Sequence, residues 1–487
     1  PHQRLALART LAPAATGATG RPVRRAWIPK PGKTEQRPLG IPTMGDRAAQ
    51  TLVRFALEPE WEARFEPNSF GFRPGRSCHD AIQAVFNGIR FRAKYVLDAD
   101  IAACFDRINH QTLLDKLHTF PTLRRVIRGW LKAGVVDGKE LFPTDEGTPQ
   151  GGAISPLLAN VALHGLETHL RASFPGSHRG DRYWKPIVVR CADDFVVLHQ
   201  DLAVIEQTRQ IANMWLAGMG LELKPGKTRI AHTLVEHEGR VGFDFLGCTV
   251  RQFPAGHYRS ARSTRGAVLG FKTHIKPSAE AQKRHLETIA DVVRRYRQSL
   301  QEVLVEQLNP KIVGWARYYA TGVAKDVFSR MDHLVYLKLK RWAERRHPHT
   351  SKWWVAGRYW HTRRGRMWNF GPKKGPVLAW YADTPIQRHV KVKGTASPFD
   401  GNWAYWASRM GHHPELPTRV ATLLRRQQGR CARCGLYFAR DDLPEVDHIT
   451  PKHLGGSDAY SNWQLLHRHC HDSKTAEDRA SAARLSV

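Results

Sequence analysis

The chain has 487 residues, more than one hydrophobic core usually holds, and its 41% of hydrophobic residues and 15 Trp argue against disorder. Its 75 Lys and Arg against 44 Asp and Glu give a formal net charge of +31 at pH 7, which favours a polyanionic partner, most simply a nucleic acid. No apolar run approaches the roughly 20 residues of a transmembrane helix. The sequence shows no isolated amphipathic anchor, so an anionic membrane surface is the weaker alternative.

The seven cysteines do not resemble a disulfide framework. Four are scattered, at Cys78, Cys104, Cys191 and Cys248, while three cluster near the C-terminal end. This distribution predicts a reducing compartment and one local metal site. The chain starts with Pro and shows no signal peptide, so an additional N-terminal segment stays an open alternative.

Residues 1 to about 255 alternate apolar strands with helical stretches, which predicts an α/β region with strands at 95–101, 186–199 and 243–250. From about 256 to 375 the pattern turns helical and basic. Two apolar stripes at helical spacing predict helices docked on a core, formed by Leu286, Ile289, Val293 and Tyr296, and by Met331, Val335, Leu339 and Trp342. Their cationic faces could bind phosphates, and a solvated Lys/Arg face is the alternative for any single helix.

Five Trp lie among cations between 350 and 395. Flat aromatic rings beside cations can stack on bases, but the same residues could form the core of a small module. The segment 391–402 is typical of a linker, and a last unit runs from about 416 to 487.

The sequence VVRCADDFVVL places Asp193 and Asp194 side by side between two β-branched runs. A polar turn explains such a pair, and so does a cation site. Asp100, near the end of the strand predicted at 95–101, offers a third acid. Three carboxylates can hold two Mg²⁺ ions about 4 Å apart, the usual device for in-line nucleotidyl transfer.

Blocks of sequence in one fixed order make the cation site the stronger interpretation. They lie at 28–43, 68–82, 100–110, 147–167, 191–198, 220–230, 243–250 and 308–319. Together they resemble the ordered blocks of group II intron-encoded reverse transcriptases. The resemblance implies a multidomain α/β plus α fold: a right-hand polymerase with fingers and palm, a helical thumb (maturase domain X), and a C-terminal zinc-stabilised ββα-metal (HNH) domain. The implied boundaries are 1–255 for fingers and palm, 256–350 for the thumb, 351–415 for a basic Trp-rich DNA-binding region with a linker, and 416–487 for the HNH domain.

The resemblance also implies roles for residues at matched positions. Asp100, Asp193 and Asp194 would be the catalytic acids that hold two Mg²⁺. The nucleotide-binding candidates are Lys30, Arg37, Phe105, Gln150 and Lys227. Phe105 would be a steric gate that excludes ribose, with a core Phe as the alternative, and Asp106 would orient a neighbour. One departure is Cys191, where the family usually has Tyr; a small thiol there should loosen the primer terminus. The second expected departure is the N-terminal extension of the family, which would be absent or shortened here.

Two short-spaced ligand pairs predict a structural zinc site near the C-terminus. Cys431 and Cys434 form the first pair, and His467 with Cys470 the second, while His469 and His471 compete for the fourth position.

Between these pairs the chain resembles the HNH motif. The match makes His448 the general base and gives Asp447 and His471 one Mg²⁺ or Mn²⁺. Asn462 would orient the His448 imidazole or tie the motif together. The alternative is a zinc-stabilised DNA-binding module without cleavage.

The resemblance therefore implies a reverse transcriptase and RNA-splicing maturase with an HNH DNA endonuclease. Its expected partners are group II intron RNA, target DNA and deoxynucleoside triphosphates, and no membrane association is expected. It is expected in the bacterial cytoplasm, as a nucleoid-associated ribonucleoprotein. Two alternatives are a polymerase-impaired maturase that mainly binds intron RNA, and a host-adapted reverse transcriptase with a nuclease domain.

Overall fold

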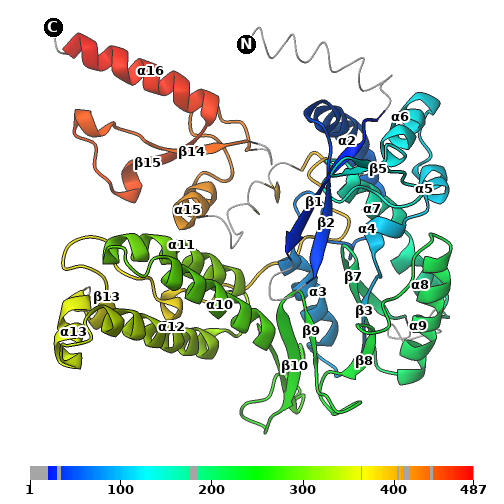
Figure 1. Ribbon diagram of the computed structural model, residues 1–487, viewed down its shortest axis with the longest axis horizontal. Helices are drawn as coiled ribbons and strands as arrows, with labels where there is room; N and C mark the ends of the chain where they lie inside the picture. The colour runs from blue at the N-terminus through cyan, green and yellow to red at the C-terminus, as the bar shows by residue number, and fades with distance from the viewer. Residues whose placement is uncertain are drawn as a thin grey trace. The chain divides into compact units, whose positions relative to one another are not determined.

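The computed structural model describes residues 20–29, 35–175, 185–363, 365–402, 405–406, 409, 417–438 and 442–485. They fall into two compact units, Pro1–Ser278 with Lys391–Thr395 and Ala279–Val390 with Ala396–Val487. Figure 1 labels the elements of both units. In the described part of the chain, no helix combines the length and apolarity that a membrane crossing requires.

One four-stranded sheet of the first unit carries the three predicted acids and is called the carboxylate sheet below. Its strands in spatial order are β6 (Ile187–Cys191), β7 (Asp194–His199), β3 (Tyr95–Asp100) and β8 (Arg229–His232). All neighbours are antiparallel. Strands β6 and β7 form a hairpin over the strand segment expected at 186–199, and β3 is the strand expected at 95–101. Apolar alternation at 95–101 and the two β-branched runs within 186–199 therefore located both segments correctly.

Helices cover the two faces of this sheet. On one face Leu97, Phe195 and Val197 are fully buried in a core shared with three helices. These helices are α5 (His110–Leu117), α7 (Ser155–Leu163) and α9 (Leu202–Ala217). The other face packs against α3 (Cys78–Ile89), so closely that a Cβ on Gly88 would come within 2.9 Å of the Leu198 side chain.

The other helices of the first unit complete its core. They are α2 (Met44–Arg64), α4 (Cys104–Arg107), α6 (Pro121–Leu131) and α8 (Leu166–Ala172). Helix α2 begins where the Thr43 hydroxyl accepts a hydrogen bond from the Asp46 backbone N–H at 3.2 Å, which satisfies one of the unpaired N–H groups of the first turn.

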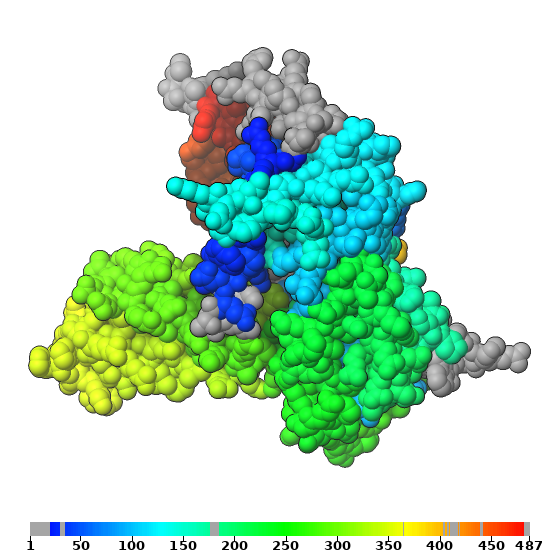
Figure 2. Space-filling model, turned by 45° about the vertical axis from the view of Figure 1, so that its right-hand side comes forward, coloured from blue at the N-terminus to red at the C-terminus, as the bar shows by residue number. Residues whose placement is uncertain are grey.

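Two further sheets flank the first. One of these two sheets has the order β2-β1-β4-β5. Its strands are β2 (Gln36–Ile41), β1 (Val23–Pro29), β4 (Val135–Asp137) and β5 (Glu140–Phe142). Figure 2 shows the blue surface of the N-terminal strands beside the cyan surface of the β4–β5 hairpin, as the β1–β4 pairing requires. The second has the order β11-β10-β9, formed by β11 (Phe271–Pro277), β10 (Cys248–Pro254) and β9 (Phe243–Phe245).

The third sheet corrects two expectations. The strand expected at 243–250 is interrupted, because Leu246 and Gly247 both adopt positive φ, of 49° and 77°, and turn β9 back onto β10. Helical structure expected from about 256 begins only at Ala279, because 271–277 pairs with β10 over its whole length. Hydrophobic pattern alone revealed neither the turn at Leu246 nor the strand at 271–277.

The first part of the second unit is a helical bundle with a small hairpin. Its elements are α10 (Ala279–Arg295), α11 (Gln301–Tyr319), α12 (Lys325–Arg346), α13 (Lys352–Tyr359), β12 (Trp360–Arg363), β13 (Arg366–Phe370) and the 3₁₀ turn η1 (Tyr381–Asp383). The stripe expected in the second helix is confirmed, since Met331, Val335, Leu339 and Trp342 are buried. In the first stripe Ile289 is fully buried and the other three residues are half-buried.

In the Trp-rich segment some Trp side chains are buried and others are exposed, so each interpretation fits part of it. Trp360 is buried against Phe370, with ring centroids 5.1 Å apart, as the core interpretation expects. Trp353 is 84% exposed, and Trp354 and Trp368 are 46% exposed, which leaves flat rings available for stacking.

The C-terminal module of the second unit is built from α15 (Thr418–Arg426), β14 (Pro444–His448), two 3₁₀ turns, η2 (Lys452–Leu454) and η3 (Tyr460–Asn462), β15 (Trp463–His467) and α16 (Arg468–Leu485). Strands β14 and β15 are antiparallel, and α16 follows β15 directly. Its core includes the fully buried Leu423, Phe438 and Leu465.

The expected linker at 391–402 is not wholly a linker. The Val392 backbone N–H donates to Asp80 at 2.8 Å, and Arg76 donates to the Gly394 carbonyl at 2.9 Å. Residues 391–395 therefore belong to the first unit.

Candidate functional site

The three predicted acids converge at one end of the carboxylate sheet. Asp100, the last residue of β3, lies directly opposite Asp194, the first residue of β7. Asp193 occupies the turn before β7, and its carbonyl accepts a hydrogen bond from the Ile101 backbone N–H at 3.4 Å. Strand pairing thus brings together carboxylates that lie more than 90 residues apart in sequence.

Electrostatics at this end of the sheet favour bound cations. Burial raises the pKa of Asp194 to about 7, and the nearby Asp193 and Asp100 add to the rise. Burial also raises the pKa of Asp193, while Lys227 and Arg37 oppose that rise. Divalent cations would offset the repulsion between these groups, and hard carboxylate oxygens are the ligands that Mg²⁺ prefers.

Lys227 lies against one of the acids. Its ammonium donates to Asp100 Oδ2, and although burial lowers its pKa, this contact and the other acids raise it overall. Lys227 was expected near the nucleotide, and in this structure it partly neutralises the carboxylate site.

The shifted pKa of Asp194 predicts a pH-dependent stability. Between its ordinary pKa of 3.8 and about 7, the folded protein keeps a proton that the unfolded chain has lost. The free energy of unfolding therefore falls as pH rises through this window. Asp194→Asn removes that cost, so the Mg²⁺-free variant should melt on the order of a few degrees above the parent at about pH 8, with a smaller difference at about pH 4.

Differential scanning calorimetry of parent and variant, dialysed free of Mg²⁺, measures this difference. Equal melting temperatures of parent and variant at the higher pH would contradict the claim that burial destabilises the charged form of Asp194.

A buried arginine supports the turn that carries Asp193, and sequence reasoning missed it. Arg190 on β6 is 3% exposed. Its guanidinium donates to the Ala192 carbonyl and to Asn160 Oδ1, both at 3.1 Å, and to Ser69 Oγ at 2.7 Å. Ala192 has a φ of 60°, which is costly for a residue with a Cβ, so the turn needs such support. The signal in the sequence was a single cation inside an otherwise apolar strand.

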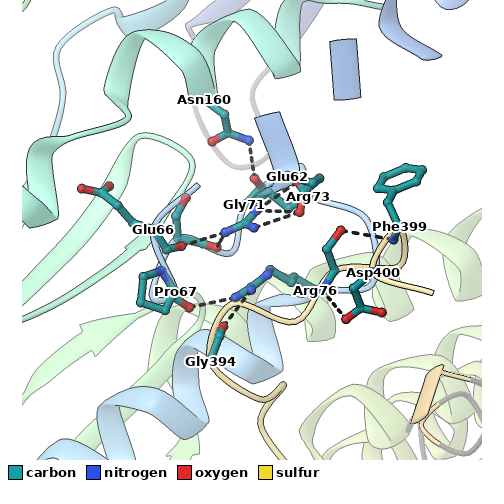
Figure 3. A network of polar contacts seen from close by, with 12 residues as sticks. Glu62, Glu66, Pro67, Gly71, Arg73, Arg76, Asn160, Gly394, Phe399 and Asp400 are labelled. Carbon is teal, nitrogen blue, oxygen red and sulfur yellow. Dashed lines mark hydrogen bonds and ion pairs between the residues drawn. The ribbon is translucent and has the colours of Figure 1, made fainter. Parts of the chain in front are cut away.

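A network of polar contacts holds the loop before α3 (Figure 3). This loop approaches the Ala192–Asp193 turn closely. A Cβ on Gly71 would come within 2.2 Å of the Ala192 nitrogen, so only glycine allows the contact. Asn160 donates to the Gly71 carbonyl at 2.8 Å. Arg73, fully buried, binds Glu62 through both carboxylate oxygens and so fixes the loop from behind.

The nucleotide-binding candidates lie around the same end of the sheet. Gln150 donates to both carboxylate oxygens of Asp106, at 3.2 and 3.1 Å, which agrees with an orienting role for Asp106. Phe105 is half-buried, with one side on the core and its ring 6.0 Å from the ring of Phe72. Arg37 lies on β2, and its charge acts on Asp193. Lys30 lies outside the described residues.

A second set of ligand groups gathers in the C-terminal module. The ligand atoms of Cys431, Cys434, His467 and Cys470 all lie within 4.8 Å of one another. Burial alone would raise the pKa of Cys431, but backbone N–H groups that donate to its sulfur lower it to about 7. Three sulfurs and one imidazole at this spacing suit a tetrahedral Zn²⁺.

The geometry selects one histidine of the three that competed. His467 Nδ1 lies 3.3 Å from Cys434 Sγ, while its Nε2 lies 3.3 Å from Asp442. A carboxylate on the outer nitrogen is the usual partner of a metal-bound histidine. His471 instead faces Asp447, at 3.9 Å.

The candidate nuclease residues lie on neighbouring elements of the same module. Asp447 and His448 end β14, and His471 lies on the first turn of α16. The Asn462 amide binds Thr450 N, Thr450 O and Ser457 O, all at 2.9 Å. These contacts fit the second of its two expected roles, which is to tie the motif together.

Two residues that contact these candidates were not predicted. Asp458 lies 2.9 Å from His448 Nε2 through its carboxylate. Lys474 donates to the His448 carbonyl at 2.9 Å and lies 3.2 Å from Asp447. Lys474 follows His471 by three residues on α16, and that helical spacing was the available signal.

Comparison with known families agrees with this geometry. Residues 28–250 match the family model for reverse transcriptase (RNA-dependent DNA polymerase), residues 282–360 that for the group II intron maturase-specific domain, and residues 431–477 that for the HNH endonuclease.

Individual relatives match parts of the chain. The chain is 35% identical to protein YkfC of Escherichia coli over 257 residues, which cover 46% of this chain and 66% of the relative. It is 43% identical to the group II intron-encoded protein LtrA of Lactococcus lactis over 152 residues, 30% of this chain and 25% of the relative. An uncharacterized 91 kDa protein in a cob intron of Schizosaccharomyces pombe is 38% identical over 149 residues, 30% of this chain and 18% of the relative. The chain thus matches less than two thirds of each relative's length.

Proposed function

We propose, on the premise that the chain belongs to the family of group II intron-encoded proteins, that it copies RNA into DNA, assists splicing of an intron RNA and nicks a DNA target. The observation that carries the polymerase is the pairing of Asp100 with Asp194 beside Asp193 at one sheet end. Such a protein would work in the bacterial cytoplasm as a ribonucleoprotein on the nucleoid.

In the proposed polymerase, Asp100, Asp193 and Asp194 would hold two Mg²⁺. When bound, these ions lower the pKa of the primer 3′-hydroxyl and neutralise charge on the leaving pyrophosphate. Arg190 keeps the turn, and with it Asp193, in place. In this proposal the carboxylate sheet is the palm and the sheet β2-β1-β4-β5 belongs to the fingers.

Other residues would select and hold the incoming nucleotide. Phe105, fixed on one side by the core, would exclude the ribose 2′-hydroxyl. Gln150, held by Asp106, would line the nucleotide pocket, and Arg37 and Lys30 would bind the triphosphate.

In the proposed nuclease, His448 would take a proton from the attacking water, and Asp447 and His471 would hold one Mg²⁺ or Mn²⁺. This ion would stabilise negative charge on the scissile phosphate. Lys474 holds the Asp447–His448 dipeptide against α16, and Asp458 orients the imidazole.

The helical bundle and the Trp-rich segment would bind nucleic acid. Arg341 and Arg345 are exposed on α12, beside its buried stripe. Phosphate contacts of this kind make affinity fall steeply with salt. We expect the helical bundle, as the thumb, to bind intron RNA. We expect the exposed Trp side chains to bind target DNA.

The function is tested with the intron RNA that flanks the gene, in a splicing assay and in primer extension on an RNA template. Faster splicing and Mg²⁺-dependent extension are expected. Splicing without extension, with extension restored in Cys191→Tyr, would favour a polymerase-impaired maturase. Extension without any effect on splicing would favour a host-adapted reverse transcriptase.

The sulfur cluster predicts about one tightly bound zinc ion per chain. Elemental analysis after dialysis against metal-free buffer measures it. Cys434→Ser should lose the zinc and lower the melting temperature of the C-terminal module, because the four ligands join both ends of that module. His469→Ala is the matched control and should keep the zinc. A zinc-free parent protein would exclude the site.

A further inference from the structure

Two thiols face each other beside the carboxylate site. Cys78 Sγ and Cys191 Sγ lie 3.7 Å apart. We propose that Cys78 and Cys191 are a modification site: a reversible disulfide forms between them under oxidising conditions and reduces polymerisation. The consequence for polymerisation rests on the proposed function, whereas the bond itself does not.

The two sulfurs come from elements that meet at the acid end of the sheet. Cys191 is the last residue of β6 and pairs with Asp194, so its side chain lies on the sheet face that carries Asp194 and packs against α3. Cys78 is the first residue of α3, the helix that covers this face. A bond between them would tie the start of α3 to the residue before the Ala192–Asp193 turn.

The distance suits bond formation. A disulfide joins sulfurs at about 2.0 Å, so the pair must approach by about 1.7 Å, which side-chain rotation and small backbone shifts can share. Cys191 is 7% exposed, while Cys78 is half-buried. Cys78 is therefore the thiol that a small oxidant reaches first.

The chemistry balances with peroxide as the oxidant. The Cys78 thiolate attacks hydrogen peroxide, which breaks the O–O bond, gives a sulfenic acid and releases one water after proton transfer. The Cys191 sulfur then attacks the oxidised sulfur, the S–S bond forms, and the hydroxyl leaves with a proton as a second water. Two thiols lose two electrons in total, and peroxide gains them. A small dithiol reverses the step by exchange.

The bond would displace a catalytic neighbour. Cys191 lies two residues before Asp193. Gly71 and Arg190 already make close contacts with Ala192, which lies between Cys191 and Asp193. Pulling Cys191 toward α3 therefore shifts Asp193 relative to Asp100. Misplacement of a reacting group by about 1 Å can cost about 10²-fold in rate.

The test treats the full-length protein with hydrogen peroxide, blocks remaining thiols with N-ethylmaleimide and maps peptides by mass spectrometry. A peptide pair joined through Cys78 and Cys191 is expected. Primer extension should fall at least about tenfold and recover with dithiothreitol. Cys78→Ser should keep its extension rate after peroxide, while Cys248→Ser, which removes another buried thiol of the same unit, should lose it like the parent.

Absence of the joined peptide pair at peroxide doses that oxidise other thiols would overturn the proposal. A joined pair without any loss of extension would overturn the proposed consequence. If the reduced protein extends no primer at all, the polymerase function fails, and the peptide map still decides whether the bond forms.

Discussion

Asp193→Asn is expected to lower the rate of RNA-templated primer extension by at least about 10³-fold, because the amide cannot replace a charged oxygen ligand of a catalytic Mg²⁺. The substitution keeps the size of the side chain, and the Asp193 carbonyl can still accept from Ile101. Single-turnover extension with saturating nucleotide measures the chemical step. Binding of the template–primer should change little.

Asp98→Asn is the matched control. Asp98 lies on β3 two residues before Asp100, on the same face, and burial raises its pKa to about 6 although Arg229 opposes the rise. It faces Val196 across the sheet and lies outside the carboxylate trio. We expect a change of less than about tenfold. Equal losses of extension rate in both variants would show that the rate depends on the total negative charge of this face. Such a result would contradict a specific set of metal ligands.

His448→Ala is expected to lower DNA nicking by about 10² to 10⁴-fold, the usual contribution of a general base. Primer extension should stay within about twofold of the parent, because the nuclease and polymerase residues belong to separate compact units. A nicked-plasmid assay and primer extension on the same preparation measure both activities.

His453→Ala serves as the control for this variant. His453 lies in the 3₁₀ turn η2 of the same module. The control should nick at the parental rate, since His453 has no proposed role. Loss of both activities in His448→Ala would contradict the independence of the two sites.

Local pattern located the acids because their positions depend on short-range signals. Apolar alternation at 95–101 specified strand β3. Two β-branched runs within 186–199 specified β6 and β7, and the break between these runs specified the turn. Adjacent aspartates in that turn were visible without any knowledge of the fold. The three acids could therefore be predicted, and strand pairing then brought them together.

The supporting residues could not be predicted, because they act through contacts between distant parts of the chain. Arg190 reaches Ser69 across 121 positions, and Arg76 reaches Gly394 across 318. No periodicity encodes such pairs. The same reason explains the expected linker, whose Val392 is held by the carboxylate of Asp80 in the first turn of α3.

The ambiguity among the three C-terminal histidines was also a matter of geometry. His467 ends β15, whereas His469 and His471 lie on α16. The change from strand to helix turns their side chains in different directions, which residue spacing alone does not reveal. Likewise, the break at Leu246 depends on a positive φ that a non-glycine residue seldom adopts.

Anomalous scattering from Mn²⁺ tests the central claim most directly. Crystals of the protein with an RNA template, a DNA primer and a non-reactive nucleotide analogue should show two Mn²⁺ peaks about 4 Å apart, bound by Asp100, Asp193 and Asp194, with Lys227 displaced from Asp100. Mn²⁺ absent from these carboxylates while nucleotide is bound would contradict the claim that the paired aspartates form a two-metal polymerase site.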